Sequence, residues 1–350
     1  MSLVLHKPAA DRGGPAQPLL IVGGLRKHFP IRGGLLGRNR GAVHAVDGVG
    51  FQVGKGEILG VVGESGCGKS TMARLLARLI EPDGGEVIFD GDGVGAADGI
   101  SIRDLRRDLQ LVFQDSFASL NPRMTIEDSV AFGPRIQGLS AAEAMRVAHD
   151  MLGRVGLEPS RFGGRYPHEL SGGQRQRVNI ARTLATRPRL VILDEAVSAL
   201  DKSVQAQVLN LLLDLKAELN LTYIFISHDL NVVQYISDRV LVMYLGQVVE
   251  IGPVDSLYRD ARHPYTRALL SAVPSVDPER RTRHSPLTGD PPSPVNPPPG
   301  CRFRQRCPHA RAVCAAALPE PVEIAPGHRA ACFMADPASG YDSSPTEGGR

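Results

Sequence analysis

A glycine-rich segment at residues 63–71, GESGCGKST, constrains the fold of this chain more than any other stretch of its sequence. It follows the apolar run ILGVV and precedes TMARLLARLI, in which apolar residues recur at helical spacing. Glycines allow backbone N–H groups to surround phosphate oxygens, and a helix that begins there presents the positive end of its dipole to the same anion. The order strand, loop, helix therefore predicts a phosphate-binding loop in an α/β domain, with an unrelated glycine-rich turn as the alternative.

The residue types in this loop indicate what each residue binds. Lys69 is expected to reach the β- and γ-phosphates of a nucleotide, and Ser70 is expected to be a ligand of Mg²⁺. The other residues expected to contact the nucleotide are Gly63, Glu64, Ser65, Gly66, Cys67, Gly68 and Thr71. Because a nearby cation lowers the pKa of a thiol, Cys67 is either reactive or simply a small residue between two glycines, and we favour the second interpretation.

Two further apolar runs end in residues suited to hydrolysis. The first, RLVILD at residues 189–194, ends in Asp194, which is predicted to hold Mg²⁺ directly or through water. Glu195 follows and is predicted to polarise the attacking water as a general base. The second run, TYIFIS at residues 222–227, is followed by His228, which is expected to contact the γ-phosphate and the water. Strands that end in ordinary surface residues are the alternative.

The composition limits the class of protein. The chain has 350 residues, 42% of them hydrophobic, and a formal net charge of +3, which is too small to indicate a nucleic-acid partner. No apolar run approaches the roughly 20 residues that span a bilayer, and the N-terminus does not resemble a signal peptide. We therefore expect a cytoplasmic protein, in which disulfides are not favoured.

One segment makes the interpretation specific. LSGGQRQRV at residues 170–178 resembles the signature of ABC-transporter ATPases. VFQD around Gln114, SALD ending at Asp201, and His228 stand in the motif order of that family. The resemblance covers roughly residues 20–255. It implies an α/β fold with a P-loop NTPase (RecA-like) core, an antiparallel β subdomain and a helical subdomain over about residues 116–180.

The resemblance also implies roles for further residues. Gln114 would take part in catalysis and contact Mg²⁺, and Phe29 would stack on the adenine of ATP, with His28 as the second candidate. Two ATPase subunits would face each other head to tail, with ATP between them. The residues that would bind nucleotide held by the partner are Ser171, Gly172, Gly173 and Gln174, which begin a helix, and Asp201 belongs to the same set.

Three segments indicate a closer resemblance. FQDSFASLNPRMTI, DEAVSALDKSVQAQVLNLL and HPYTRALLSAVP are similar to the ATP-binding subunits of oligopeptide and dipeptide ABC importers. The resemblance implies ATP hydrolysis coupled to peptide import at the cytoplasmic face of the inner membrane. Its partners would be a second, related ATPase, two permeases and, indirectly, an extracytoplasmic binding protein. Ala196 departs from the proline usual in the family, and hydrolysis is still expected.

Two other functions are alternatives. The first is an ABC importer for nickel or another small solute, and the second is a soluble ABC ATPase outside transport. The second alternative is disfavoured because the chain shows one cassette and no strongly basic arm.

The C-terminal part gathers four of the five cysteines: Cys301, Cys307, Cys314 and Cys332. Their spacing contains no CxxC pair and matches neither common zinc ribbons nor the usual ferredoxins. The segment resembles the C-terminal extension of peptide-importer ATPases, which implies that the cysteines are ligands of an iron–sulfur cluster, of the [4Fe–4S] type. Zn²⁺ is the alternative metal, and a small packing module with free cysteines is the alternative without metal.

These observations predict four segments. Residues 1–18 are expected to be a disordered leader, 19–255 the ABC ATP-binding domain, 256–335 the C-terminal extension with the cysteines, and 336–350 a disordered tail. Within the second segment, VLVMYLGQVVEIG predicts a β-hairpin that turns near Gly246.

Overall fold

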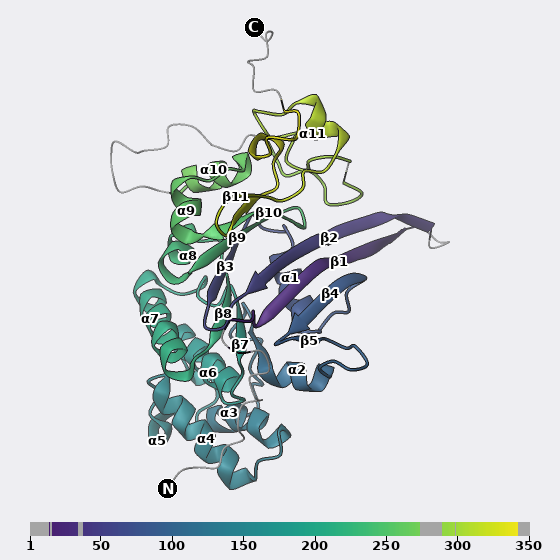
Figure 1. Cartoon of the computed structure of the whole chain (residues 1–350). Coiled ribbons are helices and arrows are strands. Elements are labelled where there is room, and N and C mark those ends of the chain that lie inside the picture. Colours follow the sequence, from purple (N-terminus) through teal and green to yellow (C-terminus); the bar gives the residue numbers. More distant parts are fainter. Residues whose placement is uncertain (1–13, 15, 34–37, 274–288, 298, 342–350) are drawn as a thin grey trace.

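The computed structural model describes residues 14, 16–33, 38–273, 289–297 and 299–341, which form two sheets flanked by helices (Figure 1). Most of the leader expected at 1–18 and of the tail expected at 336–350 lies outside the described residues, as does residue 298. Within the described part of the chain, no helix combines the length and the apolar character needed to cross a membrane.

The larger sheet has eight strands in the order β11–β12–β10–β9–β3–β8–β7–β6. Its parallel part consists of β6 (Leu109–Val112), β7 (Leu190–Asp194), β8 (Thr222–Ile226), β3 (Ile58–Val62) and β9 (Arg239–Tyr244). Its antiparallel part adds β10 (Gln247–Pro253), β12 (His328–Ala330) and β11 (Val322–Ala325). Every residue of β3, β7 and β8 is buried, as expected for parallel strands covered on both faces.

The smaller sheet is antiparallel and has the order β2–β1–β4–β5. It contains β1 (Leu20–Gly33), β2 (Arg38–Val53), β4 (Gly84–Phe89) and β5 (Asp92–Gly93). Strand β3 separates the two halves of the core, because its side chains alternate. Leu59 and Val61 pack in the cluster that includes the smaller sheet, whereas Ile58 and Val62 pack in the cluster that includes the helices after β6.

The helices follow the expected pattern of an α/β chain. Their bounds are α1 (Lys69–Leu76), α2 (Ile102–Asp108), α3 (Ile126–Ile136), α4 (Ala141–Arg154), α5 (Pro159–Phe162), α6 (Gly172–Leu184), α7 (Lys202–Leu219), α8 (Leu230–Ile236), α9 (Val254–Arg259), α10 (Pro264–Ser271) and α11 (Ala312–Ala316). Helices α3 to α6 form a group at one end of the molecule (Figure 1), where the helical subdomain was predicted. Ser140 and Glu143 form a capping box that fixes the start of α4.

The C-terminal part joins the larger sheet. Strand β12 pairs with β10, and the predicted hairpin turns at Leu245 and Gly246, whose φ angles of 43° and 79° are those of a tight primed turn. Residues 294–296 lie along β2, because the backbone N–H of His44 donates to the carbonyl of Pro294 at 3.0 Å and Val295 bridges Val43. The described part of the proline-rich segment is therefore held against the smaller sheet.

A buried histidine joins α10 to β10. The Nδ1 atom of His263 accepts from the backbone N–H of Tyr265 at 3.0 Å, and the backbone N–H of His263 donates to Glu250 Oε2 at 3.0 Å. His328 also hydrogen-bonds Glu250, at 2.8 Å. Burial lowers the pKa of His263 to about 4, and the negative charge of Glu250 opposes this shift.

This arrangement predicts a pH dependence of stability. In the unfolded chain a histidine binds a proton near pH 6.5, whereas His263 in the folded chain does so only near pH 4. The unfolded state therefore binds more protons between these values, and the free energy of unfolding should fall as the pH is lowered. We expect a loss of about 2 kcal/mol from His263 between about pH 7.5 and 5, measured by urea unfolding.

The His263→Asn variant keeps a hydrogen-bond acceptor at the start of α10 and should lose most of this pH dependence. The matched control is His168→Asn, because His168 is exposed. The prediction would be contradicted if the free energy of unfolding changed with pH equally steeply in His263→Asn and in the wild type.

Candidate functional site

The loop between β3 and α1 is enclosed by other backbone segments. Gly63 and Gly68 have φ angles of 150° and 107°. A Cβ atom on Gly63 would clash with the carbonyl oxygen of Met243, and one on Gly68 with that of Ala45. Only glycine fits these two positions, so the loop keeps its N–H groups close to any anion that it binds. Ser65, Gly66 and Thr71 complete this loop and the first turn of α1.

Lys69 is folded into the loop. Its Nζ atom donates to the carbonyl of Gly63 at 2.8 Å and to that of Glu64 at 3.1 Å, and its side chain is almost completely buried. Cys67 lies 3.7 Å from the same Nζ atom. Burial raises the pKa of the Cys67 thiol, and Lys69 opposes the shift only in part. This favours the interpretation of Cys67 as a packed small residue over that of a reactive thiol.

Ser70 and Asp194 provide oxygen atoms suited to Mg²⁺. The Ser70 hydroxyl donates to Asp194 Oδ1 at 3.0 Å, and Asp194 is buried at the end of β7. Burial raises the pKa of Asp194, the hydrogen bond from Ser70 lowers it, and the charge of Glu195 raises it further. A buried carboxylate whose charged form is disfavoured is stabilised by a cation, so the donor set fits a hard divalent ion.

Gln114, Glu195 and His228 meet beyond the ends of three neighbouring parallel strands. Gln114 Nε2 donates to Glu195 Oε2 at 2.8 Å, and His228 Nδ1 lies 3.6 Å from the same oxygen. Glu195 has a φ angle of 49°, which costs on the order of 1 kcal/mol or more for a residue with a side chain. Its backbone N–H donates to the carbonyl of Ile226 at 3.0 Å, which holds this conformation.

The two aromatic candidates for adenine differ in their surroundings. His28 stacks on His44 with 3.8 Å between ring centroids, and its Nε2 atom lies 3.0 Å from Asp47 Oδ1. Phe29 is 37% exposed, with Lys27 Nζ at 5.7 Å from its ring centroid. Since the ring of His28 already has partners, these contacts favour Phe29 as the stacking residue.

The signature residues form the N-terminus of α6. The Ser171 hydroxyl accepts from the N–H of Gln174 at 3.3 Å, and the Gln174 side chain accepts from the N–H of Ser171 at 3.0 Å. A Cβ atom on Gly173 would lie 2.5 Å from Val204, and Asp201 begins α7. In the described part of the chain, no hydrogen bond or ion pair joins residues 171–174 to residues 63–71. The phosphate loop and the signature residues therefore lie at separate places on the described part of this chain.

The four C-terminal cysteines line one cavity. Phe303 and Met334 also line this cavity, whose volume is about 10 Å³. Burial and the neighbouring thiols raise the pKa of Cys307 and of Cys332 to about 11. The four sulfur atoms therefore line one space, and Cys307 and Cys332 keep their protons at neutral pH unless a cation stabilises the thiolates.

The spacing of these sulfur atoms bears on which metal fits. Tetrahedral Zn²⁺ with Zn–S bonds of about 2.3 Å requires sulfur atoms about 3.8 Å apart. Among the described residues, the one group of three ligand atoms mutually within 4.8 Å is His28, His44 and Asp47, which includes no cysteine. No three of the four sulfur atoms among the described residues therefore lie mutually within 4.8 Å, so the thiols do not stand in the geometry of a closed zinc site.

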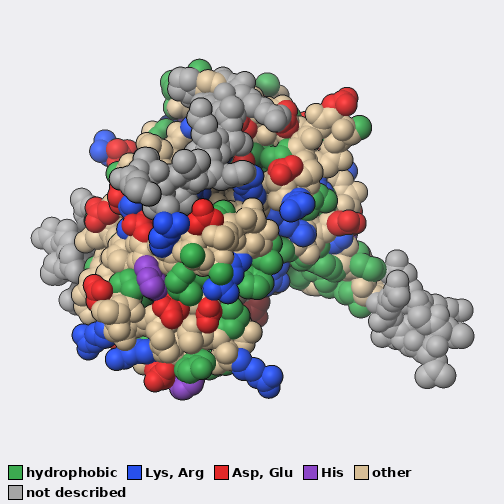
Figure 2. All heavy atoms as spheres, turned by 90° about the horizontal axis from the view of Figure 1, so that it is seen from below, with side chains coloured by type: hydrophobic (Ala, Val, Ile, Leu, Met, Phe, Trp, Pro, Cys, Tyr) green, Lys and Arg blue, Asp and Glu red, His purple; other side chains and the backbone are tan. Residues whose placement is uncertain are grey.

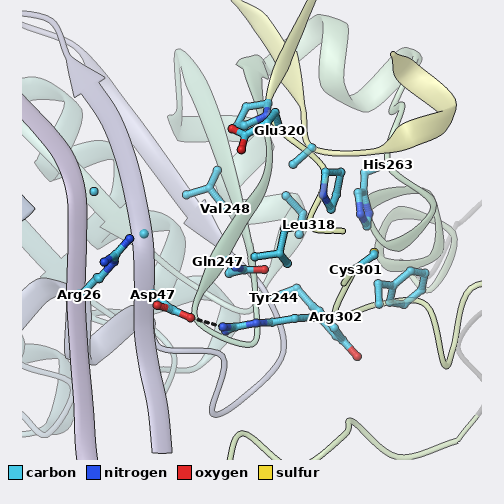
Figure 3. A pocket seen from close by; sticks show the side chains of 17 residues that line it. Arg26, Asp47, Tyr244, Gln247, Val248, His263, Cys301, Arg302, Leu318 and Glu320 are labelled. Atoms are coloured by element: carbon cyan, nitrogen blue, oxygen red, sulfur yellow. Dashed lines mark hydrogen bonds and ion pairs between the residues drawn. The ribbon is translucent and has the colours of Figure 1, made fainter. Parts of the chain in front are cut away.

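Glu64 makes contacts that no local sequence pattern indicates. Its carboxylate accepts from Arg306 at 2.8 and 3.1 Å, and its N–H donates to the Tyr265 hydroxyl at 2.8 Å. Arg302 similarly pairs with Asp47 on β2, across a cavity between the smaller sheet and the C-terminal part (Figure 3). Arg302 and Arg306 were visible in the sequence, but the carboxylates that they pair with, Asp47 and Glu64, lie 255 and 242 residues away.

Comparison with known proteins shows which family this chain resembles. The ABC transporter family model matches residues 46–198. The oligopeptide transport ATP-binding protein AppF of Bacillus subtilis is 50% identical over 91% of this chain and 98% of its own length. A Brucella ovis protein, named as a peptide import ATP-binding protein, is 51% identical over 90% of this chain and 98% of its own length.

This chain belongs to the ABC transporter ATPases. Solved structures agree with the fold of this ABC ATPase. The dimeric ATP-binding cassette MJ0796, with bound ADP and Pi, has a TM-score of 0.58 and 30% identity, covering 67% of this chain and 98% of the solved chain. CbiO1 of Clostridium perfringens has a TM-score of 0.59 and 29% identity, covering 69% of this chain and 91% of its own. The predicted family and the predicted α/β P-loop fold are thereby confirmed. A second family model, for the C-terminal region of oligopeptide/dipeptide transporters, matches residues 249–314 of this ABC ATPase.

Lys69 provides a direct test of the phosphate loop. The Lys69→Ala variant should lose at least 100-fold in affinity for MgATP, because it removes the one cation that the loop itself contributes. Calorimetric titration of the full chain measures this. The matched control is Lys216→Ala, which removes a lysine paired with Asp238 on the surface of α7. Unchanged affinity in Lys69→Ala would contradict the assignment.

Proposed function

We propose that this ABC ATPase hydrolyses ATP to drive the import of oligopeptides or dipeptides through a membrane complex. The observation that carries the proposal is the match of residues 249–314 to the C-terminal region of oligopeptide/dipeptide transporters, which follows the ABC match at 46–198. The names of the relatives support the same substrate class. We assign residues 19–255 to the ATP-binding domain and 256–335 to the extension.

The ATP site follows from the contacts described above. Lys69 and the N–H groups of the loop would bind the phosphates, and Ser70, Asp194 and Gln114 would hold Mg²⁺. Mg²⁺ supplies charge neutralisation at the phosphates when bound. Phe29 would stack on the adenine, which leaves the ring of His28 with His44 and Asp47.

Glu195 is suited to the role of general base. Its carboxylate lies beyond the carboxyl ends of the parallel strands, where Gln114 donates to it and His228 lies 3.6 Å away. Glu195 would accept the proton of the attacking water, while His228 would contact the γ-phosphate and hold the water in line. Ala196 is buried and leaves the Glu195 carboxylate in this position.

The separate halves of the site support a head-to-tail pair of ATPase subunits. The signature residues 171–174 of one chain would face the nucleotide on the phosphate loop of the other. We propose a related chain as the second ATPase, with two permease subunits and an extracytoplasmic binding protein completing the complex. The chain would then lie at the cytoplasmic face of the inner membrane.

The helical subdomain offers hydrophobic surface for such partners. Phe117, Phe132 and Ile136 are 52%, 54% and 66% exposed. Figure 2 shows hydrophobic side chains on the face seen from below, between clusters of charged ones. We propose that these side chains contribute to the surface that contacts the permease subunits.

The four C-terminal cysteines are proposed ligands of an iron–sulfur cluster of the [4Fe–4S] type. The observation behind this proposal is that all four cysteines line one cavity, and Zn²⁺ is the alternative metal. When bound, the cluster would tie together residues that lie up to 31 positions apart, from Cys301 to Cys332. Its role would be structural, because no residue assigned to hydrolysis lines the cavity.

Replacement of Glu195 tests the proposed mechanism. Glu195→Gln keeps the shape of the side chain and removes the base, so ATP turnover by the assembled complex should fall by about 10²- to 10⁴-fold. MgATP affinity should stay within about threefold of wild type, since the phosphate loop is intact. Phosphate release measures turnover, and Glu81→Gln, on the exposed surface, is the control. Near wild-type turnover in Glu195→Gln would refute the role.

Metal analysis tests the cysteine site. Chain purified without oxygen should contain about four iron and four sulfide per chain, and Cys314→Ser should lose most of both. Cys67→Ser is the matched control and should retain them, because Cys67 lies in the phosphate loop. A fully folded chain without metal would refute the ligand set, and one zinc per chain would support the alternative metal.

A further inference from the structure

Glu64 in the phosphate loop is held at two points by residues from the C-terminal part. Its carboxylate accepts hydrogen bonds from both terminal nitrogens of Arg306, at 2.8 and 3.1 Å. Its backbone N–H donates to the Tyr265 hydroxyl at 2.8 Å. The Arg306 side chain is 5% exposed and that of Glu64 is 24% exposed. A bidentate pair of this kind fixes both the distance and the orientation of a carboxylate.

The segment that carries Arg306 is itself firmly anchored. Phe303 is buried against Tyr244, His263 and Tyr265, with ring centroids 5.4, 5.7 and 5.5 Å away. The backbone N–H of Cys301 donates to the carbonyl of Cys314 at 2.8 Å. Arg306 also lies 3.5 Å from the Tyr244 hydroxyl. The guanidinium therefore approaches the loop from a rigid support.

The same short segment contacts the adenine side of the site. Arg302 pairs with Asp47 on β2 and donates to the carbonyl of Leu245 in the β9–β10 turn (Figure 3). Arg302 and Arg306 both lie between Cys301 and Cys307. One segment of the extension thus reaches both β2, in the sheet that carries Phe29, and the loop that carries Lys69.

The position of Glu64 matters for phosphate binding. Its carbonyl oxygen accepts from Lys69 Nζ at 3.1 Å, so residue 64 and the phosphate-binding cation are directly connected. Its carboxylate, without a partner, would add a negative charge beside a site for polyphosphate, and such repulsion is strong where water is partly excluded. Arg306 neutralises this charge and fixes the position of the carboxylate through two hydrogen bonds.

We propose that Arg306 is a positioning residue for the phosphate loop, and that the segment between Cys301 and Cys307 thereby sets the affinity of this ATPase for ATP. The inference rests on the proposed function, because it assumes that ATP binds at Lys69. Arg306 contacts no nucleotide itself and acts through Glu64.

The test is calorimetric titration of MgATP into the full chain. Arg306→Ala should bind about tenfold more weakly than wild type, a difference of about 1.4 kcal/mol. Arg306→Lys keeps the charge but not the bidentate geometry, so its affinity for MgATP should lie between those of the wild type and Arg306→Ala. Arg304→Ala removes a neighbouring arginine that donates to the carbonyl of Pro299, and should bind within twofold of wild type.

The partner variant separates positioning from a loss of folding. Glu64→Gln is the reference for the double variant, and Arg306→Ala/Glu64→Gln should bind MgATP within threefold of Glu64→Gln, because the unpartnered charge is gone. Binding by the double variant as weak as that of Arg306→Ala would show that Arg306 acts only through the fold and would overturn the proposal. Thermal unfolding of each variant accompanies the titrations, and Arg306→Lys serves where Arg306→Ala does not fold.

The kinetic readout and the reference variant complete the design. In the assembled complex, Arg306→Ala should raise KM for ATP about tenfold and leave kcat within twofold, whereas a fall in kcat alone would overturn the role. Lys69→Ala is the reference in the same titration. If wild type binds and Lys69→Ala does not, an unchanged Arg306→Ala overturns the positioning role alone. If wild type does not bind MgATP, the proposed function fails and the inference fails with it.

Discussion

The close packing of the phosphate loop against two other backbone segments is the constraint on which the rest of the structure depends. Gly63 lies against the carbonyl of Met243 on β9, and Gly68 against that of Ala45 on β2. The turn after β9 closes the arrangement, since the N–H of Gly246 donates to the carbonyl of Cys67 at 2.8 Å. These contacts fix the smaller sheet, the larger sheet and the loop relative to one another. The side chains proposed for hydrolysis follow strands of the larger sheet, so the same contacts set their positions relative to the loop.

The parts of the fold that were predictable are those encoded by local pattern. The runs at 189–194 and 222–227 became β7 and β8, because unbroken apolar segments are buried on both faces of a parallel sheet. Ser171 and Gln174 lie three residues apart, as a capping box requires, so the start of α6 was also encoded locally. Gln114, Glu195 and His228 come together because the strands that precede them are neighbours with the same direction.

The parts that were not predictable depend on contacts between distant segments. Arg306 and Glu64 are 242 residues apart, and neither residue carries a local signal for the other. The pairing of β12 with β10 could not be read from the short, mixed sequence of β12, because its partner edge is created only when the β9–β10 hairpin forms. The left-handed conformation of Glu195 is another such case, since its surroundings rather than its residue type impose it.

Buried charge links the C-terminal extension to the ATP site. Asp194 is buried beside Glu195, so the site holds two carboxylates whose charge favours a bound cation. A third carboxylate, Glu64, lies at the other side of the phosphate loop and would oppose binding of a polyanion if it lacked a partner. The chain neutralises it with Arg306 from the extension rather than with a residue of the loop. Because Arg306 stands directly before Cys307, whatever orders the four thiols also orders the group that neutralises Glu64. The extension is therefore better understood as a support for the nucleotide site than as an independent module attached behind it.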